Sequence, residues 1–328
     1  MTKEVPVDCL CLGIVVADHV CEPISHVPHA GELVLTPRTH LSIGGCAANV
    51  AVDLARLSRK AAVVGRVGDD AFGRFAIDAL STASVDVRHI ASLPGEATST
   101  SMIINVRGED RRFIHAPGAN AWLEGNEISP ELLKQTRAVY VGGYGLSDRP
   151  TPERIAALFR AARELGVKTI LDVVVPQGKD CWPFLQPVLP WTDVFLPNDD
   201  EARDITGHAD PARQAHAFRE AGARTVVITC GHRGALVASP SGVFRAPPFL
   251  IEFVDGTGSG DAFAGGYIHA LLEGCDVGEC VRVGSALGAS CVRATGATTG
   301  VFNAAQLSDF LRSHPQELLP AHGFPSAP

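Results

Sequence analysis

The stretch VDGTGSGDAFAGGYIHALLEG, residues 254–274, places three glycines and two acids between residues 255 and 261, directly before a segment of helical period. Apolar and small residues recur at helical spacing after Asp261, and Gly274 ends the pattern, so the sequence predicts a helix that begins at or just after Asp261. The unpaired amides of such a helix start, joined by those of a glycine-rich turn, form a binding site for an anion such as phosphate. An aspartate that only caps the helix is the simpler alternative.

A carboxylate inside a phosphate-binding turn needs a chemical reason, because like charges repel. Phosphoryl transfer supplies one. Asp261 would take the proton of an acceptor hydroxyl, while the backbone amides of Gly258, Ser259 and Gly260 would stabilise charge on the moving phosphoryl group. We expect the helix dipole to keep Asp261 ionised.

The length, net charge and cysteine content of the chain indicate an enzyme that acts on small molecules. The chain has 328 residues, a formal net charge of −8 and no basic block, which argues against nucleic acid or a membrane surface as a partner. No run approaches the roughly 18 apolar residues of a membrane span. Nine cysteines without a Cys-x-x-Cys spacing fit neither a disulfide framework nor a zinc site, so we predict a cytoplasmic protein.

Short β-branched runs alternate with stretches of helical period, which is typical of an α/β fold with a mostly parallel central sheet and helices on both faces. The apolar run at 10–17 predicts a further buried strand. We expect one domain over residues 1–312 and a loose tail over 313–328. The predicted strands are 61–68, 138–143, 168–175, 193–198 and 224–231, and the predicted helices between them include 154–166 and 212–222.

Two segments interrupt this alternation. Residues 101–120 predict a β-hairpin with its turn at 108–110, and residues 21–42 read as extended chain. We expect a small β-sheet from about 19–43 and 96–118 that forms a lid over the active site. A pair of surface hairpins without a role is the alternative.

Two signatures resemble the ribokinase-like, or PfkB, carbohydrate kinases. DGTGSGDAFAGG, residues 255–266, is close to the family's DTTGAGDAFxGG, with Gly256 in place of Thr and Ser259 in place of Ala. SIGGCAANVAVDLARLSRKAAVVGRVGDDAFG, residues 42–73, matches the N-terminal signature. The resemblance runs from Leu10 to about Leu307. It implies a three-layer ribokinase-like fold with a β lid and an ATP- and magnesium-dependent kinase that acts on a sugar.

The resemblance also implies roles for individual residues. The expected substrate contacts are Asp18, Gly44, Gly45, Asn49 and Asn120. The expected nucleotide contacts are Asn198, Thr229, Gly231, Gly258 and Gly260. Glu201 would organise Mg²⁺, largely through water, and Asp255 and Thr257 would help to hold a monovalent cation such as K⁺. By spacing alone, a helix capping box is the favoured interpretation of Asn198 and Glu201.

Departures from the family leave the substrate open. Cys46 stands where ribokinases commonly carry Lys, and VYVGGYG lacks a Glu that they have, so ribose, fructose, a related keto-sugar or a nucleoside all fit. The predicted hairpin carries three arginines, Arg107, Arg111 and Arg112. They would either bind an acidic sugar or be exposed to solvent without a role. In many relatives the lid sheets pair two subunits, which implies a homodimer.

Three other classes of function would require different sequence features. A non-catalytic sugar or nucleotide sensor on the same fold is the alternative to a kinase, but a sensor has no need for the base Asp261. An NAD-dependent oxidoreductase would need Gly-x-Gly-x-x-Gly after the first strand, and a P-loop kinase would need Gly-x-x-x-x-Gly-Lys-Ser/Thr. The sequence has neither motif in the required place.

Overall fold

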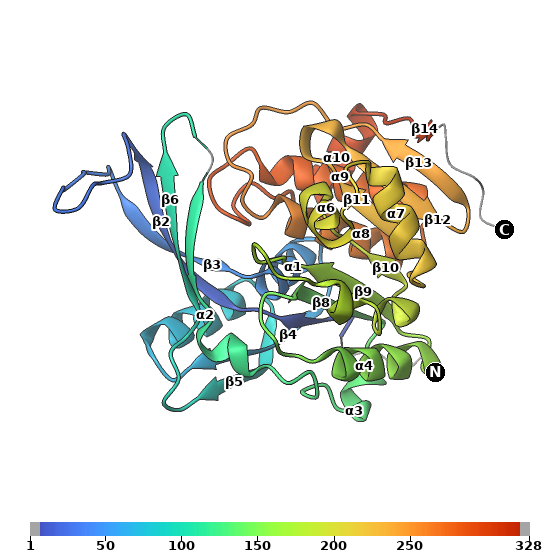
Figure 1. Ribbon diagram of the computed structural model, residues 1–328, viewed down its shortest axis with the longest axis horizontal. Helices are drawn as coiled ribbons and strands as arrows, with labels where there is room; N and C mark the ends of the chain where they lie inside the picture. The colour runs from blue at the N-terminus through green and yellow to red at the C-terminus, as the bar shows by residue number, and fades with distance from the viewer. Residues whose placement is uncertain (1–6, 110, 322–328) are drawn as a thin grey trace.

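The computed structural model describes residues 7–109 and 111–321, which form a large sheet with helices on both faces and a second, smaller sheet beside it (Figure 1). The large sheet has ten strands in the order β14-β13-β12-β11-β10-β9-β8-β1-β4-β5. They are β1 (Cys9–Gly13), β4 (Ala61–Gly68), β5 (Asp86–Leu93), β8 (Ala138–Tyr144), β9 (Lys168–Val173), β10 (Val194–Phe195), β11 (Val226–Thr229), β12 (Ala235–Ser239), β13 (Gly242–Ala246) and β14 (Leu319–Pro320). Strands from β5 to β11 in this order are parallel, and β12, β13 and β14 are antiparallel.

The helices form two layers, one on each face of the large sheet. One face is covered by α1 (Cys46–Arg56), α2 (Ala71–Thr82), α8 (Ser259–Leu272), α9 (Val277–Cys291) and α10 (Ala304–Ser313). The other is covered by α3 (Pro130–Leu133), α4 (Pro152–Glu164), α5 (Trp182–Leu185), α6 (Asp199–Thr206) and α7 (Pro211–Glu220). Short 3₁₀ helices are η1 (Gly118–Trp122), η2 (Leu189–Trp191) and η3 (Gly231–Arg233).

Strand β1 shows why the central strands are continuously apolar. Cys9 and Cys11 pack into the core on the α1 and α8 face, whereas Leu10 and Leu12 pack into the core on the α4 face. Side chains alternate between the faces of a strand, so a strand covered on both sides must be apolar at every position. The predicted α/β fold with a mostly parallel sheet is confirmed.

The position of β1 also fixes where a ligand can bind. β1 lies between β4 and β8 and is parallel to both. The next strand of the large sheet in the sequence, β4, lies on one side of β1, and the later strand β8 lies on the other, so the strand order reverses at β1. In open parallel sheets, ligands bind in the crevice beyond the carboxyl ends of the strands at such a reversal of order. Residues that follow β1, and helix α1, therefore lie at the expected site.

The small sheet has the order β3-β2-β6-β7 and stands out from the main body at the left of Figure 1. Its strands are β2 (Val16–Ile24), β3 (Thr39–Gly44), β6 (Thr100–Val106) and β7 (Arg112–Ala116). The predicted lid sheet is therefore confirmed, with β2 and β6 as its parallel central pair. Within the predicted hairpin turn at 108–110, Asp110 lies outside the described residues.

The tail differs from the expected loose segment over 313–328. Helix α10 continues to Ser313, and Leu319–Pro320 pairs with β13 at the edge of the large sheet. Gln316 donates from Nε2 to the carbonyl of Pro247. The expectation is therefore wrong for the residues up to 321, and residues 322–328 lie outside the described part of the chain.

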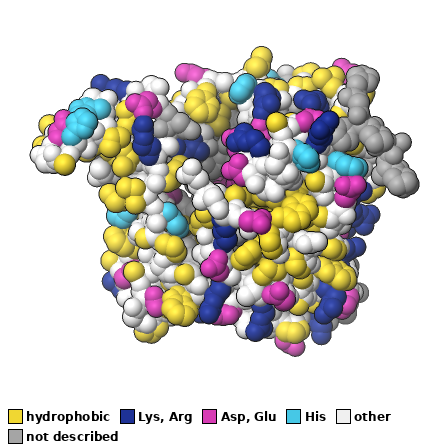
Figure 2. Space-filling model, in the orientation of Figure 1, with side chains coloured by type: hydrophobic (Ala, Val, Ile, Leu, Met, Phe, Trp, Pro, Cys, Tyr) yellow, Lys and Arg dark blue, Asp and Glu magenta, His cyan; other side chains and the backbone are white. Residues whose placement is uncertain are grey.

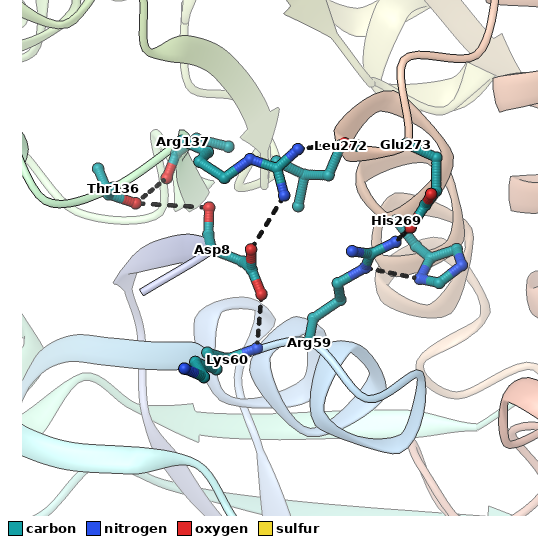
Figure 3. A network of polar contacts seen from close by, with 9 residues as sticks. Asp8, Arg59, Lys60, Thr136, Arg137, His269, Leu272 and Glu273 are labelled. Carbon is teal, nitrogen blue, oxygen red and sulfur yellow. Dashed lines mark hydrogen bonds and ion pairs between the residues drawn. The ribbon is translucent and has the colours of Figure 1, made fainter. Parts of the chain in front are cut away.

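The C-terminal end of α8 is anchored beside the large sheet (Figure 3). Arg137 donates to Asp8 Oδ1 at 3.0 Å and also to the carbonyl of Leu272 in the last turn. Arg59, just after α1, donates from Nε to His269 Nδ1 at 3.1 Å. These contacts hold α8 against β1, β8 and α1, and so they position its other end, where Asp261 lies.

The surface carries charges of both signs. On the face shown in Figure 2, Lys, Arg, Asp and Glu side chains are interspersed with apolar ones. Among the described residues, no helix combines the length and apolar character that crossing a bilayer requires.

Candidate active site

The predicted glycine-rich turn and helix start are present at α8. Gly258 is the N-cap residue in a left-handed conformation with φ of 77°, which a side chain would disfavour. Gly260 and Asp261 lie in the first turn, where amides have no carbonyl one turn before them to bond. The N–H of Ser259 instead donates to the carbonyl of Gly256 at 3.3 Å. The amides of Gly258, Gly260 and Asp261 lie around this helix start, whereas the amide of Ser259 is bonded within the turn.

Asp261 is partly buried and held by two residues of α1. Asn49 donates from Nδ2 to Asp261 Oδ2 at 2.8 Å. Burial raises the pKa of Asp261, and hydrogen bonds from Asn49 and Cys46 oppose that rise. Burial therefore outweighs these hydrogen bonds and makes Asp261 a stronger base than an exposed aspartate.

Asn49 has a further feature that indicates a ligand. Its side chain is 4% exposed, and its Oδ1 has no hydrogen-bond partner among the described residues. Buried amide oxygens are usually bonded. A substrate hydroxyl beside Asp261 would supply the missing donor.

Asp18 and Gly44 lie against each other on paired strands β2 and β3. A Cβ atom at position 44 would collide with the Asp18 carboxylate, so a side chain there would displace that carboxylate from its present position. Asp18 is 7% exposed. Burial, aided by the charge of Asp261, raises the pKa of Asp18 to about 6, while a hydrogen bond from Ser101 opposes the rise.

Two lid residues that the sequence analysis missed extend this polar surface. Asp18, Ser101 and His115 are directly opposite one another across β2, β6 and β7. The hydroxyl of Ser101 lies 3.1 Å from His115 Nδ1. His115 Nε2 is buried without a hydrogen-bond partner in the described chain, and burial lowers the pKa of His115. The alternation of the predicted hairpin was the only available signal, because the pairing with Asp18 is long-range.

Gly45 and Asn120, two further predicted substrate contacts, have clear local roles. Gly45 is the N-cap residue of α1 with φ of 93°, and its carbonyl accepts from the Asn49 N–H at 2.9 Å. Asn120 is 3% exposed, and its amide bonds both backbone groups of Val15, at 3.2 and 3.0 Å. Asn120 therefore fixes the segment between β1 and β2 instead of directing its bonds toward Asp261.

Asp172, at the end of β9, is a site residue that the sequence analysis also missed. Ligand atoms of Cys46, Asp172 and Asp261 all lie within 4.8 Å of one another. Tyr140 donates to Asp172 Oδ2 at 2.6 Å. Burial raises the pKa of Asp172 well above its ordinary value, and the charges of Glu201 and Asp261 add to the rise. An acid at the carboxyl end of a buried strand was the signal that could have identified it.

Asn198 and Glu201 form the capping box that their spacing allowed. Glu201 N–H donates to Asn198 Oδ1 at 2.8 Å, and Asn198 N–H donates to Glu201 Oε2 at 3.0 Å, at the start of α6. Burial and the charge of Asp261 raise the pKa of Glu201 to about 7, against the hydrogen bond from Asn198. Thr229 pairs with Asn198 in a short parallel bridge, and Gly231 follows in η3. The capping hydrogen bond therefore occupies one carboxylate oxygen of Glu201, while the charge of Glu201 still interacts with those of Asp172 and Asp261.

Asp255 and Thr257 hold the anion-binding turn to the loop after α9. Asp255 Oδ1 accepts from both the N–H and the hydroxyl of Thr257, and its Oδ2 accepts from the Gly296 N–H at 2.9 Å. The carbonyl of Thr257 accepts from the Cys291 thiol at 3.2 Å. These oxygens have backbone and thiol partners already, so their first role is to fix the turn.

The site thus brings together groups from α1, β2, β3, β9, α6 and α8. A glycine-rich helix start, a carboxyl beside it and a separate small β-sheet are the parts expected of a phosphotransferase of the α/β class. The chain belongs to the PfkB family: residues 7–303 match the pfkB family carbohydrate kinases. It is an ATP-dependent kinase.

Relatives of known activity match over most of this chain. It is 28% identical over 307 residues to the ribokinase of Haemophilus influenzae, a match that covers 92% of this chain and 97% of that protein. It is 30% identical over 289 residues to the aminoimidazole riboside kinase of Salmonella typhimurium, covering 83% and 88%. Among solved structures, the ribokinase of Arabidopsis thaliana with ribose and ATP superposes with a TM-score of 0.80 at 24% identity, covering 93% and 99%, which shows the shared fold.

Proposed function

We propose that this kinase transfers the γ-phosphoryl group of ATP to a primary hydroxyl of a sugar such as ribose, fructose or a related compound. The observation that carries the proposal is the pair Asn49 and Asp261. Asp261 lies beside the anion-binding turn, and the amide that bonds it keeps a buried oxygen without a partner. Two sugar hydroxyls would satisfy both groups, one donating to Asn49 Oδ1 and the other, the acceptor, donating to Asp261.

Asp261 is proposed as the base. The acceptor oxygen attacks the γ-phosphorus, the bond from that phosphorus to the ADP oxygen breaks, and the hydroxyl proton passes to the Asp261 carboxylate. The amides at Gly258 and Gly260 stabilise the charge on the phosphoryl group in transit. Asp18, Gly44, Gly45 and Asn49 are the proposed sugar contacts, and the lid limits access of water, which would otherwise accept the phosphoryl group.

Magnesium fits the residues present. The charges of Glu201 and Asp261 raise the pKa of Asp172, and the charge of Asp261 raises the pKa of Glu201, so a cation among them would offset an unfavourable interaction. Carboxylate oxygens are the ligands that Mg²⁺ prefers, and the ion would supply charge neutralisation of the nucleotide phosphates. Glu201 is proposed to hold it, largely through water. Thr229, Gly231 and Asn198 are proposed on the nucleotide side, and Asp255 and Thr257 at a K⁺ site.

Asn120 stays among the proposed substrate contacts only through its second amide hydrogen, since its two bonds to Val15 take one donor and the acceptor. A nucleoside is the alternative acceptor. The 30% identity to a riboside kinase favours keeping it.

The lid is proposed to pair two subunits. Met102 and Ile114 are opposite each other on β6 and β7, on the face away from Ser101 and His115, and are 54% and 59% exposed. A polar face toward the site and an exposed apolar face away from it suit a homodimer contact. We also propose a cytosolic location, which the cysteine content supports.

The test is an ADP-release screen of wild type and Asp261→Asn with ribose, fructose, ketodeoxy sugar acids and nucleosides. We expect the wild type to turn over at least one acceptor. Asp261→Asn should lower kcat by about 10²–10³-fold or more, while binding of ATP is nearly unchanged, because a positioned group of this kind contributes roughly 3 kcal/mol to the barrier. Absence of turnover by the wild type on every acceptor would favour the sensor.

A further inference from the structure

One basic residue of the lid reaches the anion-binding turn. Arg111 directly precedes β7, and its guanidinium lies beside Gly256, where Nη1 would be 3.0 Å from a Cβ atom built on that glycine. Arg111 also acts electrostatically on Cys291, whose thiol bonds the Thr257 carbonyl. The positive charge of Arg111 therefore lies close to the turn that begins α8.

The two neighbouring arginines of the same hairpin are more exposed than Arg111. Arg112 forms an ion pair with Glu109, with both side chains about half exposed, and Arg107 is exposed. Arg111 is less exposed than either, and its Cζ lies 5.5 Å from the centre of the Phe113 ring. A cation held against an aromatic face loses less freedom when it binds an anion.

Gly256 is the residue that makes this approach possible. A Cβ atom there would meet Arg111 Nη1 at 3.0 Å and the Phe253 ring at 3.6 Å, so a methyl group would require a small shift of the guanidinium and a larger side chain a larger one. The signature that this chain resembles has Thr at this position. Gly256 and Arg111 therefore form a matched pair that links the lid to the turn.

We propose that Arg111 is a phosphate-binding residue supplied by the lid, and that Gly256 keeps its path to the phosphate open. This rests on the proposed function of the turn. Asp18, Asp172, Glu201 and Asp261 make the site strongly acidic, and an anionic nucleotide entering it needs compensating positive charge. A guanidinium gives two parallel hydrogen bonds to phosphoryl oxygens, which suits the γ-phosphoryl group. An acidic group on a sugar presents the same chemistry, and the experiment separates the two.

The first experiment is binding, measured by titration calorimetry with Mg²⁺ and without any sugar. Wild type, Arg111→Gln, Arg111→Lys and the matched control Arg112→Gln are titrated with a non-hydrolysable ATP analogue and with ADP. We expect Arg111→Gln to weaken binding of the ATP analogue by about ten- to a hundredfold, as for loss of a charge-assisted hydrogen bond, with a smaller effect on ADP. Arg111→Lys should recover part of the loss, and Arg112→Gln should match the wild type.

The second experiment tests the pair. Gly256→Thr should weaken binding of the ATP analogue in the wild-type background and should add little in the Arg111→Gln background, because the two changes remove the same contact. Equal analogue affinity in Arg111→Gln and Arg112→Gln would overturn the proposal. So would a loss confined to the KM of acidic sugars. Thermal unfolding of each variant identifies any that fail to fold, and Arg111→Lys then carries the comparison.

These readouts separate the proposal from the function on which it rests. Binding of the ATP analogue requires no acceptor, so Arg111 is tested even if no sugar is phosphorylated. If the wild type turns over a sugar and Arg111→Gln keeps full affinity for the analogue, the kinase assignment stands and the role of Arg111 falls.

Discussion

Asp53 is a fully buried acid on α1 that the proposed reaction does not use. It is 0% exposed, neither carboxyl oxygen has a hydrogen-bond partner among the described residues, and its Cβ packs against Gly265 of α8. Burial raises the pKa of Asp53 well above its ordinary value, and the charge of Asp261 adds to the rise. A folded-state pKa above the unfolded one means that the contribution to stability is present at low pH and is lost as pH rises.

We therefore expect Asp53→Ala to stabilise the protein at neutral pH. Removing an unsatisfied buried polar group should recover about 1–3 kcal/mol in the free energy of unfolding, and alanine also favours the helix. Urea unfolding at pH 8 and pH 5 measures the effect, which should be larger at pH 8. Asp53→Asn, which loses the charge and keeps the size, is the control. A loss of stability or of kinase activity in Asp53→Ala would show that the carboxyl has a partner or a role.

Single residues differ in how far the sequence could identify them. Asp261 and Gly258 lie within one continuous signature, so their proximity is local and could be predicted. Asp172 and His115 reach the site only through the packing of β9 and the register of β7, which are long-range. Asn120 shows the opposite case, in which a polar residue near the right place bonds the backbone of Val15.

Helix α8 is the element on which the site depends, and its two ends have different electrostatic roles. Its start carries Asp261, and its last turn carries His269, which accepts from Arg59 (Figure 3). Burial and the charge of Arg59 lower the pKa of His269 to about 4, from an ordinary value of 6.5. Neutral His269 therefore stabilises the fold above pH 6.5, and that contribution is lost as pH falls toward 4, because the unfolded chain binds the proton first.

We expect His269→Gln to make the protein less sensitive to acid. Between pH 6.5 and 4, wild-type stability should fall by up to about 1.4 kcal/mol per pH unit from this one group, and the variant should lack that part of the slope. Chemical unfolding at half-unit pH steps measures it. His208→Gln, at an exposed histidine outside this network, should keep the wild-type slope. Parallel slopes for wild type and His269→Gln would contradict the assignment.

Among the elements, burial decides which ones the sequence predicts. The strands β4, β8, β9 and β11 are covered on both faces, and their apolar runs were recognised. Exposed strands such as β5 and β13 carry mixed side chains and were missed. The last strand of the sheet, β14, pairs the tail with β13, and no local pattern indicates that long-range contact.

At the scale of the molecule, the lid joins the chemistry to the proposed assembly. Its inner face carries Asp18 and His115, and its outer face carries Met102 and Ile114. Two copies that met through the outer faces would hold each lid at a fixed distance from its own active site. Assembly and catalysis would then be linked.

We expect the wild type to be a dimer in solution and Met102→Lys/Ile114→Lys to be a monomer. A lysine pair placed where two apolar side chains meet would bury charge against charge in the contact, which is strongly unfavourable. Light scattering after size exclusion, from about 1 to 100 μM protein, measures the mass. Leu319→Lys, an exposed apolar residue on β14 of the large sheet, is the matched control and should stay dimeric. If the double variant keeps the wild-type mass, the contact lies elsewhere on the surface. If the dimer is lost and the KM for sugar rises while the KM for ATP does not, the partner subunit stabilises the lid over the sugar, as the two-faced arrangement of its side chains predicts.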